Sequence, residues 1–333
     1  MRKPVLVKIA GVAPVIPERI LSNSDLEKLV ETNDQWIVER TGIKTRHIVD
    51  PGVATSDLAA IAAKRVIDEA GLDAKDVDLI IVATITADMS LPATACLVQD
   101  KIGASKAWGF DLSAACSGFL YALQVGVQFV ANGTHKNVIV CGVDVMSTIV
   151  DYTDRKTCII FGDGGGAVLL QPSASEEDGC FIDFLHQVDG SGGQYLCVPG
   201  GGSRNPASHE TIDQRMHFVK QDGAVVFKFA TKKMADLCVR LLEEHNLTGK
   251  DLDVFVPHQA NLRIIQSAVE RMGMPQEKVI INIDRYGNTT AGTIPLALCT
   301  GLKEGKIKKG DLVLLAAMGA GFSAGACLLR WAY

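Results

Sequence analysis

This chain of 333 residues lacks three kinds of sequence feature, and each absence excludes a class of protein. No apolar stretch of about 18 residues is free of charged or turn-forming residues, so the sequence predicts no membrane-spanning helix. The nine cysteines form no Cys-x-x-Cys pair and are spread along the chain, which argues against a zinc site and a secreted disulfide framework. No basic run is interleaved with aromatic residues, and the net charge of −5 gives no general attraction for nucleic acid.

The composition is that of a soluble α/β protein, with 47% hydrophobic and 21% charged residues. The chain is long enough for two domain-sized cores. Residues 5–10 are strand-like, unlike the apolar segment of a secretory signal. We therefore expect a cytoplasmic protein that binds neither membrane nor nucleic acid, holds no metal ion and keeps its thiols reduced.

An internal repeat indicates how the chain is organised. Residues 72–78 precede a short apolar strand and match residues 247–253, which also precede one, at an offset of 253 − 78 = 175 residues. The expected helices are 56–70, capped by Ser56 or Asp57, and 225–245; the expected strands are 79–82, 108–112 and 137–141, then 254–256, 279–283 and 312–316. We therefore predict a duplicated α/β chain with parallel strand pairs, divided into residues 1–174 and 175–333.

Cys116 is the first candidate for chemistry. It lies in a run of small residues, 113–118, between a predicted strand and an apolar segment where a helix is expected to begin. The N–H groups at a helix N-terminus favour a thiolate, so we expect a thiol pKa that falls toward neutral. The alternative is a buried, inert cysteine that acts as a small hydrophobe.

His258 and Asn288 are the second and third candidates. His258 follows a predicted strand, and Asn288 lies in the turn that corresponds, in the repeat, to the turn of Cys116. Equivalent loops of two similar halves meet where open α/β sheets place their ligands, so the three side chains are expected to converge. The alternatives are a structural core histidine and an ordinary turn asparagine.

Several motifs together resemble β-ketoacyl-acyl carrier protein synthase III, the initiating condensing enzyme of fatty acid synthesis. They are residues 36–43, 114–119, 161–164, 257–264, 287–291 and 319–322, and the resemblance covers essentially the whole chain. It implies a thiolase-like fold, α/β in class, in which two duplicated halves form αβαβα layers. It also implies a decarboxylative Claisen condensation between a short acyl-coenzyme A (acyl-CoA), with acetyl-CoA as the expected primer, and malonyl-acyl carrier protein (malonyl-ACP). The expected products are 3-ketoacyl-ACP, CoA and CO₂. The resemblance also implies that the reaction needs no cofactor and that the enzyme is a homodimer that docks the carrier protein.

The resemblance also implies roles for the three candidates. Cys116 is the expected nucleophile, and His258 and Asn288 are the expected donors to the enolate that decarboxylation leaves. The backbone N–H groups of Cys116 and Ala320 are the expected oxyanion hole.

Binding residues follow from the same resemblance. The expected contacts for CoA and the acyl-CoA substrate are Thr32, Trp36, Arg40, Arg155, Gly223, Phe227, Asn261 and Met318. The expected docking residues for the carrier protein are Lys228, Gln259, Arg263 and Arg271. Leu91 stands where this family often has an aromatic residue from the partner subunit at the acyl pocket, so longer or branched primers are expected to fit. From the residues alone, packing is the alternative role for Trp36 and solvated charge the alternative for the arginines.

Related chemistries are separated by small differences. Elongating condensing enzymes use a second histidine where this chain has Asn288, and thiolases use a second cysteine in the turn that here is 318–321 and has none. Cys327 belongs to a buried strand by its pattern and is expected to be inert. Type III polyketide synthases share the Cys-His-Asn set and are the first alternative. A papain-like cysteine hydrolase and a non-enzymatic scaffold are the others.

Overall fold

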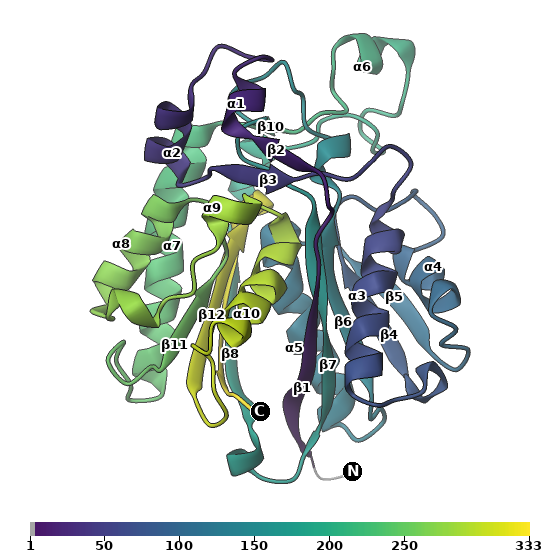
Figure 1. The fold of residues 1–333 in the computed structure, drawn as a ribbon, viewed down its shortest axis with the longest axis vertical. Coiled ribbons are helices and arrows are strands. Elements are labelled where there is room, and N and C mark those ends of the chain that lie inside the picture. Colours follow the sequence, from purple (N-terminus) through teal and green to yellow (C-terminus); the bar gives the residue numbers. More distant parts are fainter. Residues whose placement is uncertain (1–3) are drawn as a thin grey trace.

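The computed structural model describes residues 4–333 and has five layers (Figure 1). Helices α5 and α10 lie between two β-sheets, α3 and α4 cover the outer face of the first sheet, and α7 and α8 cover the outer face of the second. The helices are α1 Asn23–Leu26, α2 Asp34–Thr41, α3 Thr55–Glu69, α4 Thr94–Lys101, α5 Gly118–Ala131, α6 His209–Asp213, α7 Gly223–Glu244, α8 Leu262–Met272, α9 Ile283–Tyr286 and α10 Thr293–Lys303.

The two sheets repeat one strand order. The strands are β1 Leu6–Val15, β2 Ile20–Ser22, β3 Thr45–His47, β4 Leu79–Ala83, β5 Trp108–Leu112, β6 Val138–Asp144, β7 Gly164–Ser173, β8 Cys180–Val188, β9 Leu196–Cys197, β10 Lys220–Gln221, β11 Val254–Pro257, β12 Leu312–Gly319 and β13 Ser323–Arg330. The first sheet runs β1-β7-β6-β4-β5 and the second runs β8-β13-β12-β11. In each, two successive antiparallel pairs (β1-β7-β6 and β8-β13-β12) are followed by a parallel pair (β6 with β4, β12 with β11). The first sheet has one further parallel strand, β5 beside β4. The duplication predicted from the sequence therefore appears in the topology, while the boundary between residues 174 and 175 stays a prediction.

The strand predicted over 279–283 is wrong. Only an isolated bridge between Phe255 and Val279 stands where the first sheet has β5. Asn282 forms hydrogen bonds with side chains and not with a neighbouring strand. Its Nδ2 donates to Thr300 Oγ1 at 2.9 Å, and its backbone N–H donates to Gln259 Oε1 at 3.1 Å. Helix α9 follows at once, which ends the extended segment.

The cap predicted for helix α3 is also wrong. Its N-cap residue is Ala54, whose N–H donates to the carboxylate of Asp57 at 2.9 Å. Ser56 lies inside the helix, and its hydroxyl donates to Asp88 at 2.6 Å. The carboxylate at the third helical position thus replaces a capping hydroxyl.

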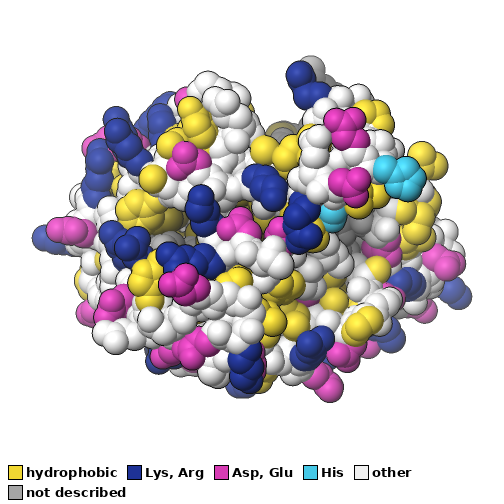
Figure 2. Space-filling model, turned by 90° about the horizontal axis from the view of Figure 1, so that it is seen from above, with side chains coloured by type: hydrophobic (Ala, Val, Ile, Leu, Met, Phe, Trp, Pro, Cys, Tyr) yellow, Lys and Arg dark blue, Asp and Glu magenta, His cyan; other side chains and the backbone are white. Residues whose placement is uncertain are grey.

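One end of the molecule is covered by short elements rather than by sheets. The hairpin β2–β3 packs there beside α1 and α2, β10 is drawn close to them, and α6 lies on the other side of this end (Figure 1). Figure 2 views this end and shows a hollowed surface where Lys and Arg side chains gather among acidic and apolar ones.

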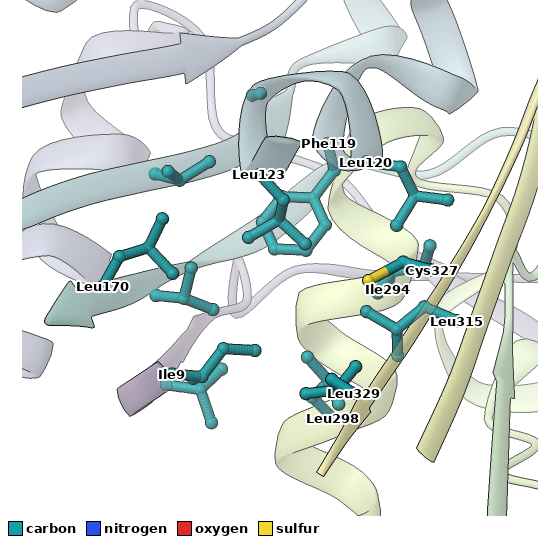
Figure 3. Packing of buried hydrophobic residues seen from close by; sticks show 14 of the residues in the cluster. Ile9, Phe119, Leu120, Leu123, Leu170, Ile294, Leu298, Leu315, Cys327 and Leu329 are labelled. Atoms are coloured by element: carbon teal, nitrogen blue, oxygen red, sulfur yellow. The ribbon is translucent and has the colours of Figure 1, made fainter. Parts of the chain in front are cut away.

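The largest apolar cluster fills the space between the two sheets (Figure 3). Its labelled members are Ile9, Phe119, Leu120, Leu123, Leu170, Ile294, Leu298, Leu315, Cys327 and Leu329. Both faces of α5 and α10 contact a sheet, so these helices are apolar nearly all round. Cys327 is fully buried among them. Within residues 4–333, no helix is both long enough and apolar enough to cross a lipid bilayer.

Candidate active site

Two equivalent turns build the site: one contains Cys116, and the other follows Asn288 closely in the chain. A 3-10 turn, Ala115–Ser117, leads into α5, and a second, Thr290–Gly292, leads into α10. Ala115 and Thr290 are 175 residues apart, and both have left-handed backbone, with φ of 47° and 50°. A residue other than glycine in this conformation costs about 1–2 kcal/mol. The repeat therefore preserves a strained turn at the start of each central helix.

Cys116 lies where two cavities meet. One has a volume of about 680 Å³ and is also lined by His258 and Asn288. The other, of about 420 Å³, is lined by Cys116 and Ala320 together with apolar side chains. The structure thus brings the three candidate side chains to one cavity, although they come from three separate segments of the chain.

The thiol of Cys116 is not poised near neutral pH, as the sequence had suggested. Burial, first, and the nearby Asp144 carboxylate, second, raise the pKa of the Cys116 thiol to about 12. Its own backbone N–H and the Asn288 side chain oppose the shift. The surroundings of Cys116 therefore oppose formation of the thiolate, and the expectation of a near-neutral pKa is corrected.

The Asn288 amide is oriented by its own turn. Its Oδ1 accepts the backbone N–H of Thr290 at 2.8 Å, which leaves the Nδ2 group as the end available to the cavity and to Cys116. The backbone of Asn288 is also fixed, because its N–H donates to Ile160 O at 3.0 Å and its carbonyl accepts the Gly162 N–H at 3.1 Å. The amide therefore presents a donor.

His258 is buried and neutral. Its ring Nδ1 lies 2.6 Å from Thr293 Oγ1, at the start of α10, and its backbone N–H donates to Ala316 O at 2.7 Å. Burial lowers the pKa of the imidazole to about 3. With Nδ1 engaged by the protein, Nε2 is the ring nitrogen available to the cavity.

The proposed oxyanion hole has room for a ligand oxygen only because residue 319 is glycine. A Cβ at Gly319 would lie 2.8 Å from the backbone nitrogen of Cys116 and 3.1 Å from that of Ser117. Ala320, the next residue, borders the same cavity as Cys116. This placement is compatible with the predicted role of the two N–H groups, which stays a prediction.

Comparison with known proteins decides the family. Residues 110–190 match the family described as 3-oxoacyl-[acyl-carrier-protein (ACP)] synthase III, and residues 242–331 match its C-terminal unit. Over 326 residues, the chain is 60% identical to β-ketoacyl-[acyl-carrier-protein] synthase III of Koribacter versatilis, with 98% of each protein covered. The chain belongs to the β-ketoacyl-acyl carrier protein synthase III family. This membership makes it an acyltransferase of the condensing class.

Further relatives support the family and its fold. The synthase III of Solibacter usitatus is 57% identical over 327 residues, covering 98% of this chain and 99% of that protein. The crystal structure of 3-oxoacyl-[acyl-carrier-protein] synthase III from Aquifex aeolicus VF5 has a TM-score of 0.90 at 41% identity, covering 98% of this chain and 100% of that one. The priming β-ketosynthase of the R1128 polyketide pathway has a TM-score of 0.91 at 30% identity, covering 100% and 98%. The expected thiolase-like fold of this synthase III family is confirmed.

Most of the predicted CoA contacts lie on the larger cavity of this family member. They are Trp36, Arg40, Arg155, Gly223, Phe227, Asn261 and Met318. Thr32 does not line this cavity. Asn261 already uses both ends of its amide, since Nδ2 donates to Arg40 O at 2.9 Å and Oδ1 accepts the Arg263 N–H at 2.9 Å.

Two guanidinium groups lie over the indole ring of Trp36. The Cζ atoms of Arg155 and Arg40 lie 5.1 and 5.3 Å from the ring centroid, and Arg155 also donates to Glu31 O at 2.8 Å. The ring therefore already stacks on a cation, and a purine bound between Trp36 and Arg155 would have to displace this arginine.

The predicted carrier-docking residues divide into three kinds. Lys228 and Arg263 are exposed on α7 and α8, as docking requires. Arg271 is exposed but paired with Asp236 at 2.5 Å. Gln259 is wrong as a docking residue, because its side chain is fully buried and its Nε2 donates to the carbonyls of Pro257 and Ile280 at 2.8 and 3.1 Å. Its function in the fold is to hold the loop after β11.

Leu91 borders neither cavity of the single chain. Leu91 is 80% exposed. A role in the acyl pocket of a second copy stays a prediction.

Sequence reasoning missed the residues that hold the catalytic candidates in place. Thr293 contacts the ring of His258, and Thr290 and Asp144 fix the turn next to Asn288. The 175-residue offset could have pointed to Thr290, since it is the equivalent of Ala115. Nothing local in the sequence marks Asp144, which only the packing of the two halves brings to the site.

Proposed function

We propose that this chain condenses a short acyl-CoA with malonyl-ACP, and that Cys116, His258 and Asn288 carry the reaction. The convergence of these three side chains on one cavity that reaches the surface near Trp36 is the observation that carries the proposal. A thioester carried on a long pantetheine arm suits a reacting sulfur at the end of such a cavity.

In the first half-reaction, the sulfur of Cys116 attacks the thioester carbon of acyl-CoA. The new carbon–sulfur bond to Cys116 forms as the bond to CoA breaks, and the thiol proton ends on the departing CoA sulfur. The carbonyl oxygen becomes negative in the tetrahedral intermediate, where the N–H groups of Cys116 and Ala320 would stabilise it. Because the free thiol has a raised pKa, this half-reaction depends on stabilising charge as it forms.

In the second half-reaction, malonyl-ACP loses CO₂ and the bonding electrons move to its thioester oxygen. The Asn288 Nδ2 group and the proton on His258 Nε2 would donate to this enolate. In that state His258 Nδ1 accepts the Thr293 hydroxyl, which has to turn from the Thr290 carbonyl that it otherwise donates to at 3.1 Å. The enolate carbon attacks the acyl group, and the bond to Cys116 breaks to release 3-ketoacyl-ACP and a thiolate. Each bond is made or broken between the substrates and these side chains, so the scheme needs no cofactor.

The second cavity supports acetyl and larger primers. Its apolar lining includes Ile85, Met146, Ile149, Leu196, Val198 and Val219. A volume of about 420 Å³ exceeds what a two-carbon acyl group fills, so straight or branched primers of several carbons fit the same space. We include them with acetyl-CoA in the proposed substrate range.

A homodimer and a carrier-protein surface complete the proposal. Strand β5 forms an edge of the first sheet, and its first residue, Trp108, is 48% exposed, which suits pairing with a second copy. Leu91, exposed in the single chain, would then close the partner's acyl cavity. Lys228 and Arg263 supply exposed positive charge for an acidic carrier protein. We place the reaction in the cytoplasm, where its acyl-CoA and carrier substrates are made available together.

A reconstituted assay tests the proposal and its rivals. The protein is incubated with acetyl-CoA and malonyl-ACP, and the expected result is CoA, CO₂ and 3-ketobutanoyl-ACP, all lost in Cys116→Ala. Free acid without condensation would indicate a hydrolase. If Cys116 is alkylated no faster than the other thiols and no product forms, a non-enzymatic scaffold is indicated. The similarity to a polyketide priming ketosynthase is tested by a primer panel in the same assay, because the two pathways share the carrier chemistry and differ in the primer.

A further inference from the structure

A buried carboxylate at the end of β6 contacts both halves of the molecule. Asp144 is fully buried, although neither half-reaction uses it directly. From the first half, its Oδ1 accepts the Thr84 and Thr86 hydroxyls at 2.8 and 2.9 Å and the Ile85 N–H at 2.8 Å. This oxygen is therefore satisfied within residues that follow β4.

The other oxygen of Asp144 belongs to the turn that precedes α10. Its Oδ2 accepts the Thr290 hydroxyl and, at 3.3 Å, the Ala291 N–H. Thr290 has left-handed backbone, and its N–H is the group that holds Oδ1 of Asn288. A chain of contacts thus runs from the Asp144 carboxylate through Thr290 to the orientation of the Asn288 amide.

The repeat shows what this carboxylate replaces. Ala291 is 175 residues after Cys116, so its N–H is the counterpart of the N–H expected in the oxyanion hole. Asp144 has Gly319 as its own counterpart, since 144 + 175 = 319. At the Cys116 turn, the glycine leaves the space before the N–H without a side chain, whereas at the Ala291 turn Asp144 fills that space with a negative oxygen.

We propose that Asp144 is a positioning residue for condensation: its carboxylate occupies the second half's counterpart of the oxyanion hole and so holds the Asn288 amide in its donor orientation. The inference rests on the proposed function, because it concerns the same reaction. Through this hold, Asp144 is expected to affect only the second half-reaction, because Asn288 donates to the enolate whereas the Cys116 N–H acts in acyl transfer.

The charge of Asp144 affects the Cys116 thiol as well as the Asn288 turn, and these two effects can be measured separately. Burial raises the pKa of the Asp144 carboxyl, and the backbone N–H that each of its oxygens accepts opposes this rise. In its ionised form, the carboxylate also helps to raise the pKa of the Cys116 thiol. Removing the charge should therefore make Cys116 more reactive and, at the same time, make condensation slower. Replacing a residue that only maintains the fold would not raise the reactivity of Cys116 while it lowers the rate of condensation.

Asp144→Asn is the variant that breaks the contact selectively. The remaining oxygen is needed by the three donors that follow β4, so the amide NH₂ must face Thr290 and the Ala291 N–H. That N–H cannot accept a hydrogen bond, so its contact with residue 144 is lost, and the Thr290 hydroxyl has to accept from the amide instead of donating to a carboxylate, which weakens the hold on the turn. Thr290→Val removes the hydroxyl and keeps the charge of Asp144, and Thr290→Ser keeps both.

The experiment measures three quantities for each variant: iodoacetamide alkylation of Cys116 against pH, acetylation of Cys116 by acetyl-CoA, and condensation with malonyl-ACP. In Asp144→Asn we expect alkylation to be several-fold faster at neutral pH, acetylation to be kept within about threefold, and condensation to fall at least tenfold. Thr290→Val should lose condensation with alkylation unchanged, and Thr290→Ser should resemble the unaltered protein. If Asp144→Asn does not fold, the Thr290 pair carries the same test.

Two results would overturn the inference. One is condensation within about threefold of the unaltered protein in Asp144→Asn or Thr290→Val. The other is an equal fall of acetylation and condensation in a folded variant, which indicates a structural role alone. Failure of the proposed function looks different, because the unaltered protein itself would then form no acetyl-enzyme and no condensation product.

Discussion

At the scale of single residues, the sulfur of Cys116 is placed by its turn and opposed by its surroundings. A helix N-terminus favours an anion by about 0.3–1 kcal/mol, whereas burying an unpaired charge costs several kcal/mol. The second effect is the larger, and the raised pKa of the thiol follows from it. The sequence identified the residue because its neighbours are small, but burial depends on β12 and on the α10 turn, which local sequence does not reveal.

Trp36 carries a prediction about substrate recognition. Trp36→Ala should raise KM for acetyl-CoA about tenfold, because the stacking surface for the purine and for Arg155 is lost. KM for malonyl-ACP should stay within about twofold, since the carrier presents no adenine. Steady-state kinetics with each substrate varied in turn measure the split, with Trp36→Phe as the control that keeps an aromatic face. Equal increases in both KM values would contradict the assignment.

His186 carries a prediction about acid stability. Both ring nitrogens are buried without a hydrogen-bond partner among the described residues, and burial lowers the pKa of the imidazole to about 4. Between about pH 6.5 and 4, His186 is protonated in the unfolded chain and neutral in the folded one. The folded state therefore loses stability as the pH falls from about 6.5 toward 4. His186→Leu should reduce this loss by about 1 kcal/mol at pH 5, after allowance for partial exposure. Urea unfolding at pH 7.5 and 5 measures it, and an unchanged pH dependence would contradict it.

At the scale of elements, the duplicated turns before α5 and α10 place the chemistry. The sequence predicted β5 over its full observed length and the start of a helix just after Cys116, because strand hydrophobicity and a turn of small residues are local signals. It failed over 279–283, where apolar residues suggested a strand and the side-chain bonds of Asn282 decided otherwise. It also assigned Gln259 to the surface, since a polar residue after a strand gives no sign that its amide will be used inside the fold.

Gly319 tests the geometry of the Cys116 turn. Gly319→Ala would bring a methyl group to 2.8 Å from the Cys116 backbone nitrogen, so the turn or β12 must shift. We expect acetylation of Cys116 to slow at least tenfold, because a small displacement of an oxyanion donor is costly. Rapid-quench mass spectrometry measures the rate, and Gly202→Ala, where a Cβ meets nothing within 4 Å, is the matched control. Acetylation at the unaltered rate in Gly319→Ala would refute the placement of the hole.

At the scale of the whole molecule, the two halves act as one unit because their central helices share a core. The buried cluster between the sheets joins residues of β4, α5, α10 and β12, so the turns of Cys116 and Asn288 are held against each other. The layered order could be predicted from the repeat and the resemblance. The contacts between halves, such as Asp144 with Thr290, could not, because they join residues 146 positions apart in the chain.

The proposed dimer makes a prediction for Leu91. The protein should behave in solution as a particle of twice 35.6 kDa, and Leu91→Phe should narrow the acyl cavity of the partner subunit. Use of branched or longer acyl-CoA should then fall at least fivefold relative to acetyl-CoA, because a larger side chain occupies the cavity. Light scattering and a primer panel measure both. A dimer whose primer preference is unaffected by the substitution would remove Leu91 from the acyl site.

The most direct test of the account is the identity of the acylated atom. The protein is mixed with acetyl-CoA alone, digested and mapped by mass spectrometry, and then chased with malonyl-ACP. The account predicts one acetyl group, on Cys116 among the nine cysteines, released into 3-ketobutanoyl-ACP during the chase. An acetyl group on another residue, or an acetyl-Cys116 that malonyl-ACP leaves untouched, would contradict it.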